Sequence, residues 1–280
     1  MAEAEAQAAA GAQGGEARAL VRYEATEGVA VLTLDDPPAN TYTYELMRQL
    51  DSAVLRARMD DAVHVIVLRG AGEKFFCAGA DIRMLASAAP RFKYYFCLHA
   101  NETLGRLEQT PKLVIAALNG HCVGGGLEVA MAADLRWART GAGKIGLPEV
   151  NLGVLPGTGG TQRLTRLVGK ARAIELMATG RLFDFEEAAA LGLVNGLVDA
   201  PDADTFLARV KEKAREFVPP GRASKAVGAI KRAVQTGSEV AFQDALSLER
   251  ELQQQLFESE DAREGIAANL EKRKPAFKGR

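Results

Sequence analysis

Three short stretches of this 280-residue chain carry residue types that packing alone explains poorly. The first runs from Asn119 to Glu128 (NGHCVGGGLE) and places three successive glycines before a helical segment. Three glycines cost backbone entropy and offer no side chain to a core, whereas one glycine would serve a tight turn. They make sense where a ligand approaches the backbone closely, at a helix start whose unpaired N–H groups attract negative charge.

Small residues also fill a second loop, from Phe75 to Asp81 (FFCAGAD), which follows an apolar strand. The third stretch begins at 146–149 (GLPE) and continues through 151–163 (NLGVLPGTGGTQR). Its Glu149 lies between apolar residues. A glutamate on the surface there would be unremarkable, but a buried one is a candidate acid or base.

Other motifs carry less weight. Residues 141–146 (GAGKIG) match GxGxxG, but a β-branched residue and Leu-Pro follow where a dinucleotide-binding helix should begin, so we interpret the match as chance. No GxSxG, HExxH or Walker sequence is present, which disfavours serine hydrolases, metalloproteases and P-loop NTPases. His64 and His99 have the apolar neighbours of packed histidines, whereas structural and functional interpretations of His121 are evenly balanced.

Composition narrows the function classes further. Lys+Arg 35 against Asp+Glu 36 gives a net charge of −1, which lacks the basic excess of a nucleic-acid-binding protein. The 3 cysteines are far apart and form no CxxC pair, so neither a disulfide scaffold nor a zinc site is expected. No apolar run reaches the length of a membrane span, and the acidic start differs from a secretion signal. We expect a cytoplasmic protein without metal, nucleic acid or membrane partner.

Strands and helices alternate along the first two thirds of the chain. Apolar patterns predict strands at 21–24, 29–34, 63–70, 113–118 and 134–138, and helices at 44–59, 91–107 and 124–133. This alternation is typical of the α/β class with crossover connections. We divide the chain into a disordered tail (1–18), an α/β core (19–200) and a helical C-terminal part (201–280). Helices are predicted there at 202–217, 223–236, 239–256 and 261–272.

Taken together, four motifs resemble the crotonase (enoyl-CoA hydratase/isomerase) superfamily. They are CAGAD at 77–81, NGxxxGGGLE at 119–128, the GLPE…LGxxPGxGGTQRL block at 146–164 and EKRKPAF at 271–277. The resemblance extends from about Val21 to Phe277. It implies a spiral of ββα repeats with a helical C-terminal trimerisation region, assembled as a trimer or a dimer of trimers.

The resemblance also implies roles for individual residues. The backbone N–H groups of Ala80 and Gly125 match an oxyanion hole, which stabilises the enolate formed next to a thioester. Glu128 and Glu149 match the two carboxylates that flank the substrate double bond: the first activates water for attack at Cβ, and the second serves proton transfer at Cα. The CoA moiety is expected along Ala78, Gly79, Ala80, Asp81 and Ile82, with Lys272 reaching the CoA of a neighbouring subunit.

The implied activity is that of a hydro-lyase: reversible syn hydration of a trans-2-enoyl-CoA to a 3-hydroxyacyl-CoA. No cofactor is expected, because CoA is part of the substrate. Enoyl-CoA isomerisation and hydration of a branched or cyclic acyl-CoA stay open as alternatives, as does a CoA-binding protein without catalysis. Residues 41–44 (TYTY) replace the common Ala-Leu-Ser after Asn40, Arg83-Met84 replaces Lys-Glu, and Asn269 stands where some members have an aromatic residue. These departures affect the shape of the acyl and pantetheine channel.

Overall fold

The computed structural model describes residues 18–280. All but the last residue of the predicted tail therefore lies outside the described residues. The strands are β1 (Val21–Thr26), β2 (Val29–Leu34), β3 (Val65–Gly70), β4 (Phe75–Cys77), β5 (Leu113–Leu118), β6 (His121–Val123), β7 (Leu135–Arg139), β8 (Lys144–Gly146), β9 (Phe183–Asp184) and β10 (Gly196–Val198). The helices are α2 (Tyr44–Met59), α3 (Ile82–Ser87), α4 (Pro90–Gln109), α5 (Gly125–Met131), the 3-10 turn η1 (Glu149–Leu152), α6 (Gly160–Val168), α7 (Lys170–Thr179), α8 (Phe185–Ala190), α9 (Ala203–Arg215), α10 (Ser224–Gly237), α11 (Phe242–Phe257) and α12 (Glu260–Leu270).

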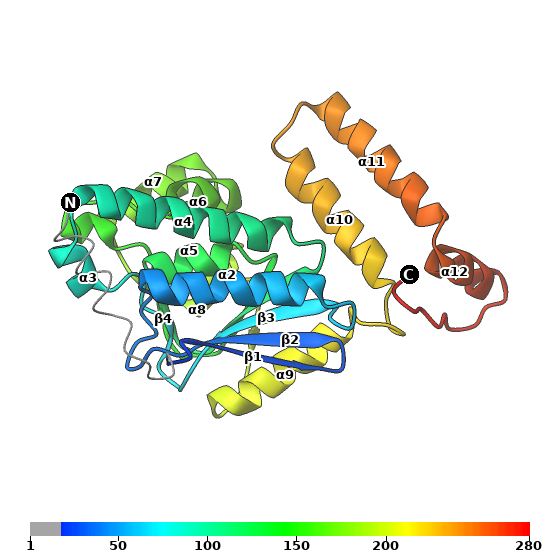
Figure 1. The fold of residues 1–280 in the computed structure, drawn as a ribbon, viewed down its shortest axis with the longest axis horizontal. Coiled ribbons are helices and arrows are strands. Elements are labelled where there is room, and N and C mark those ends of the chain that lie inside the picture. Colours follow the sequence, from blue (N-terminus) through cyan, green and yellow to red (C-terminus); the bar gives the residue numbers. More distant parts are fainter. Residues whose placement is uncertain (1–17) are drawn as a thin grey trace, which may run out of the picture.

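The larger sheet has the order β1-β2-β3-β5-β7-β10, parallel throughout except for the antiparallel hairpin β1–β2. Its central strands are buried on both faces, and successive side chains point to opposite sides. One face carries Leu32 and Leu68 into the core beneath α2 and α4. The other face packs Val31 and Val67 against α9 (Figure 1). The sheet is thus a buried layer between helices, as the predicted α/β class requires.

A second, smaller sheet has the order β4-β6-β8-β9. Its strands have only two or three residues each, too few to show an alternating pattern, and the sequence analysis predicted none of them. This sheet packs tightly against α5: a Cβ on Gly126 would overlap the carbonyl oxygen of Cys77. The loop after β4 and the start of α5 are therefore held side by side.

The predicted division at residue 200 cuts through the core. Phe206, Val210 and Ala214 of α9 are fully buried against the larger sheet, so this helix covers the face that α2 and α4 leave open. The helices that extend away from the core begin with α10 (Figure 1). A sequence pattern cannot separate these cases, because a helix covering a sheet and a helix in an extended arm have the same amphipathic period.

One buried ion pair fastens α10 to the core. Lys231 Nζ lies 2.8 Å from Asp134 Oδ2, and both side chains are buried or nearly so. Nζ also donates to the carbonyl oxygens of Leu107 and Lys112. Beyond this attachment, α11 and α12 lie away from the core. Within residues 18–280, no helix has the length and apolar character that crossing a membrane requires.

Candidate active site

The glycine run, where the sequence predicts the close approach of a ligand, is in contact with two side chains. Gly124 has a positive φ of 59°, which suits glycine. A Cβ on Gly124 would lie 3.0 Å from Oε1 of Glu149, and a Cβ on Gly125 would overlap the hydroxyl oxygen of Tyr42. The glycines therefore allow the start of α5 to contact Glu149 and Tyr42, in addition to making the turn.

The loop after β4 lies against this helix start. The Tyr42 N–H donates to the carbonyl oxygen of Gly79 at 2.9 Å, and the Asp81 N–H donates to the carbonyl oxygen of Tyr42 at 3.1 Å. A Cβ on Gly79 would lie 2.9 Å from the nitrogen of Gly125, so the two segments are in direct contact. The N–H groups of Ala80 and Gly125 come from these adjacent segments. Within residues 18–280, neither of them donates a hydrogen bond.

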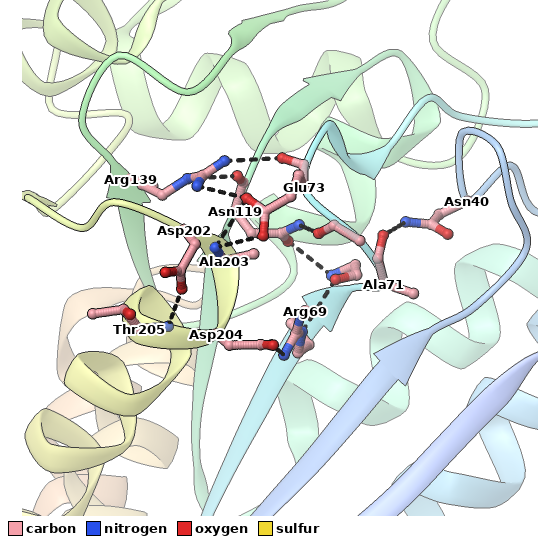
Figure 2. Close-up of polar contacts among 12 residues, drawn as sticks. Asn40, Arg69, Ala71, Glu73, Asn119, Arg139, Asp202, Ala203, Asp204 and Thr205 are labelled. Atoms are coloured by element: carbon pink, nitrogen blue, oxygen red, sulfur yellow. Dashed lines mark hydrogen bonds and ion pairs between the residues drawn. The ribbon is translucent and has the colours of Figure 1, made fainter.

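Two buried asparagines fix the turn that leads into β4 (Figure 2). The side-chain oxygen of Asn119 accepts the N–H of Gly70 at 3.0 Å, and its amide donates to the carbonyl oxygen of Gly72 at 2.9 Å. The amide of Asn40 donates to the carbonyl oxygen of Ala71 at 3.0 Å. These bonds determine where β4, and hence the loop that follows it, begins.

The outer part of the same network ties this turn to β7 and α9. Arg139 pairs with Glu73 at 2.7 Å and donates to the carbonyl oxygen of Asn119 at 3.1 Å. The carboxylate of Glu73 accepts the N–H of Ala203, the first residue of α9, at 2.9 Å. A single polar network thus joins both sheets and the helix on the far face (Figure 2).

Glu128 lies near the start of α5 and is 2% exposed. Its Oε1 accepts the backbone N–H groups of Thr158 at 2.8 Å and Gly160 at 2.7 Å. Its Oε2 accepts the hydroxyl of Thr158 in a short hydrogen bond. Burial raises the pKa of Glu128, and these three donors oppose the rise. Because two carboxylate oxygens offer about four acceptor positions, the group keeps capacity for one further donor.

The segment that supplies these donors is itself anchored. Gly160 must lack a side chain, because a Cβ there would lie 2.8 Å from Oε1 of Glu128. Arg163 donates to the carbonyl oxygen of Thr158 at 2.9 Å and makes a bidentate pair with Glu108 at 2.7 and 2.8 Å. The PGTGGTQR sequence therefore builds a rigid cradle for one carboxylate.

Glu149 begins η1 and is half-buried. Burial raises its pKa to about 7, and the negative charge of Glu128 adds to the rise. Its Oε2 is buried and has no hydrogen-bond partner among the described residues. At neutral pH this carboxyl exists in both protonation states, as suits a group that gives and takes protons.

The remaining predicted binding residues do not all lie near the two glutamates. In the loop, Asp81 caps α3 by accepting the N–H of Met84 at 2.9 Å, and Ile82 is exposed. Lys272 is exposed beyond the end of α12, on the arm that leads away from α5 (Figure 1). One chain therefore brings together the two glutamates, Ala80 and Gly125, but not Lys272.

The structure also adds residues that the sequence analysis did not assign. Tyr42 is 2% exposed, and its hydroxyl lies 3.2 Å from Oγ1 of Thr158. The signal for Tyr42 was its place among the departures from Ala-Leu-Ser, but nothing in the sequence indicated its partner. His121, which was left open, accepts the N–H of Lys144 at 3.0 Å on its Nδ1 and so bridges β6 and β8.

Comparison with known proteins connects this geometry to a family. The model of the enoyl-CoA hydratase/isomerase family matches residues 24–280. A probable enoyl-CoA hydratase of Bacillus subtilis is 39% identical over 90% of this chain and 95% of that protein. A crotonyl-CoA hydratase of Syntrophomonas wolfei is 37% identical, covering 91% of this chain and 96% of that protein.

Solved structures agree in fold. An enoyl-CoA hydratase from Geobacillus kaustophilus superposes with a TM-score of 0.89 at 46% identity, covering 93% of this chain and 97% of that one. An enoyl-CoA hydratase from Bacillus anthracis gives a TM-score of 0.86 at 34% identity, covering 93% and 100%. The crotonase-type α/β fold implied by the four motifs is thereby confirmed. The chain belongs to the enoyl-CoA hydratase/isomerase family of enzymes, in the crotonase superfamily.

Proposed function

We propose that this protein catalyses the reversible hydration of a trans-2-enoyl-CoA to the 3-hydroxyacyl-CoA. The observation that carries the proposal is a pair of carboxylates, the buried Glu128 and the half-buried Glu149, beside two backbone N–H groups that donate no hydrogen bond within residues 18–280. Relatives described as enoyl-CoA and crotonyl-CoA hydratases support the same substrate class.

The N–H groups of Ala80 and Gly125 bind the thioester oxygen of the substrate. Negative charge develops on this oxygen when the nucleophile adds at Cβ, because the electrons of the conjugated double bond move into an enolate. Two preorganised amides at that position stabilise the enolate and cost no reorganisation. The close contact between Gly79 and the nitrogen of Gly125 supports this role, since it leaves no room for a side chain between the two donors.

The two glutamates divide the proton transfers. Glu128, held by three hydrogen-bond donors, takes a proton from water while the water oxygen bonds to Cβ. Glu149, whose pKa of about 7 keeps a proton available, gives one to Cα. Return of a proton from Glu128 to Glu149 restores the starting state. Because both groups approach from α5 and η1, which meet at Gly124, addition on one face of the double bond (syn) is expected.

We also propose that the chain works as a trimer or a dimer of trimers. Between α10 and α11 lies a groove of about 670 Å³, whose lining includes Ile230, Val234 and Phe257. These three side chains are 58 to 65% exposed in the single chain, which is typical of an interface. In such an assembly, Lys272 on the projecting arm supplies positive charge to a CoA phosphate bound by a neighbouring copy.

The decisive experiment is the loss of absorbance of the conjugated thioester when the purified protein is added to crotonyl-CoA. Glu128→Gln and Glu149→Gln, prepared in parallel, are the matched controls because each removes one ionisable group and keeps nearly the same shape. A series of acyl chain lengths then defines the preferred substrate. If wild-type protein leaves every 2-enoyl-CoA unchanged, the proposed function is wrong.

The same assay separates hydration from double-bond migration. An isomerase moves one proton between two carbons, which a single acid–base group can perform. Hydration needs a base for water as well as an acid for carbon. A protein that converts 3-enoyl-CoA to 2-enoyl-CoA without consuming the product, and that tolerates Glu128→Gln, would be an isomerase.

A further inference from the structure

Two hydroxyl groups with no part in the proposed proton transfers form a chain that ends on Glu128. The Thr158 hydroxyl donates to Oε2 of Glu128, and its oxygen lies 3.2 Å from the hydroxyl of Tyr42. An ionised carboxylate only accepts hydrogen bonds, so the one hydroxyl proton of Thr158 is committed to Glu128. Tyr42 must then donate to Thr158. The chain has one direction, from Tyr42 through Thr158 to the carboxylate.

The first member of this chain is fixed at both ends. The backbone of Tyr42 bonds to the loop that carries Ala80, and its ring packs against Phe96 with 5.8 Å between ring centroids. Its hydroxyl stands where a side chain on Gly125 would be. Burial raises the phenol pKa well above its usual value, and the charge of Glu128 adds to the rise. Tyr42 therefore stays neutral and keeps its proton for donation.

We propose that Tyr42 and Thr158 are positioning residues that keep Glu128 ionised and hold its free lone pair toward the water that it activates. The inference rests on the proposed function in taking Glu128 as the base. It goes beyond that function because it assigns roles to a tyrosine that departs from the family pattern and to a threonine side chain. Neither hydroxyl needs to touch the substrate.

Besides the Thr158 hydroxyl, the backbone N–H groups of Thr158 and Gly160 and the guanidinium of Arg163 favour the ionised form of Glu128. Burial raises the pKa of Glu128, and the largest opposing influence is the Thr158 hydroxyl. Apart from Tyr42 itself, the titratable or charged groups of residues 18–280 that act on the carboxylate from other elements are Cys97 on α4, Glu149 on η1 and Arg163 on α6. Among these three, Arg163 alone favours the ionised form. The Thr158 hydroxyl thus opposes the effect of burial on the pKa of Glu128 more strongly than Arg163 does.

Three variants test the hydroxyl groups of Thr158 and Tyr42, and a fourth is a matched control. Thr158→Val removes the hydroxyl but keeps the backbone N–H that binds Oε1. Thr158→Ser restores a hydroxyl at the same place. Tyr42→Phe deletes one oxygen and keeps the ring packing and the backbone bonds. Tyr44→Phe is the control, because Tyr44 is a partly exposed residue whose ring contacts His99 and Phe92 rather than Glu128.

The readout is the pH dependence of kcat and kcat/KM for crotonyl-CoA. Loss of a donor makes the ionised carboxylate less favourable, so the acidic limb of the profile should move to higher pH. A hydrogen bond to a charged group is strong enough to move the limb by about one pH unit in Thr158→Val. Tyr42→Phe, one bond further away, should move it in the same direction by about a third as much. KM should change less than about twofold, because the substrate contacts are intact.

A direct titration makes the test independent of turnover. In protein labelled with carbon-13 at the glutamate carboxyls, the Glu128 resonance is the one missing from Glu128→Gln. Its midpoint should rise in Thr158→Val and Tyr42→Phe, return in Thr158→Ser and stay unchanged in Tyr44→Phe. If it titrates at the wild-type pH in both Thr158→Val and Tyr42→Phe, the inference is overturned, even if hydration is confirmed. If the wild type hydrates no enoyl-CoA, the proposed function fails. This titration still decides whether the two hydroxyl groups keep Glu128 ionised.

Discussion

Replacing Glu149 by glutamine should stabilise the fold at neutral pH while it lowers kcat for hydration by at least about 100-fold. Burial, with the charge of Glu128 adding to it, raises the pKa of this carboxyl from 4.5 to about 7. In the unfolded chain the same group ionises near its ordinary pKa. The unfolded state therefore releases its proton first as the pH rises. Stability is unaffected below about pH 4.5 and is lost progressively up to about pH 7.

The magnitude follows from the two pKa values. The interval between 4.5 and about 7 corresponds to about 3 kcal/mol, at about 1.4 kcal/mol per pKa unit. Glu149 is only half-buried, and solvent screening reduces the effect to about 2 kcal/mol. Glutamine carries no charge and has no such pH-dependent cost. The stability of Glu149→Gln relative to wild type should rise by about 2 kcal/mol between pH 4.5 and pH 8.

Denaturant unfolding at fixed protein concentration, repeated across this pH range, measures the difference. Glu102→Gln is the matched control, because Glu102 is an exposed glutamate on α4 outside the site. This variant controls for replacing a glutamate by glutamine at a position away from the two carboxylates. If the curves of Glu149→Gln and wild type run parallel from pH 4.5 to pH 8, Glu149 is not a carboxyl with a raised pKa, and its assignment as the proton donor loses its physical basis.

Further predictions concern the packing of α5, the attachment of α10 and the oligomeric assembly. Gly126→Ala should destabilise the fold by about 1–3 kcal/mol and lower kcat, because its Cβ would overlap the Cys77 carbonyl and shift α5; an unchanged Tm and kcat would contradict the packing. Lys231→Ala should cost about 3–5 kcal/mol in denaturant unfolding by leaving Asp134 buried without its cation, and a loss below about 1 kcal/mol would show that the pair is solvated. Light scattering should give a mass that is a multiple of three chains, and deletion of residues 260–280 should weaken acyl-CoA binding; a fully active monomer would refute the shared site.

The long elements of the core could be predicted because their patterns are local. Helix 44–59 and strands 29–34 and 113–118 have the predicted bounds, since each combines enough apolar positions to show its period with clear ends. The second sheet could not be predicted in this way. Its strands are defined by pairing with segments distant in the chain, as when Lys144 and Ile145 pair with β9. In strands of two or three residues, side-chain period carries no information.

The residues of the candidate site also differ in whether local sequence indicates them. Glu128 and Glu149 could be singled out because unusual neighbours mark them: a run of glycines before one, and apolar residues around the other. In the structure, Glu128 is buried and Glu149 is half-buried. Tyr42 and Thr158 lie 116 positions apart, and only the fold brings their hydroxyls together. A residue that acts through a partner distant in sequence leaves no local pattern.

The most direct test of the account is the hydration rate of crotonyl-CoA by wild type, Glu128→Gln and Glu149→Gln under identical conditions. Circular dichroism and acyl-CoA binding on the same samples establish that each variant is folded and loaded. A general acid or base contributes about 10²–10⁴-fold, so kcat should fall by at least about 100-fold in each variant while binding persists. A folded, substrate-binding variant of either glutamate with near-normal kcat would contradict the paired-carboxylate mechanism.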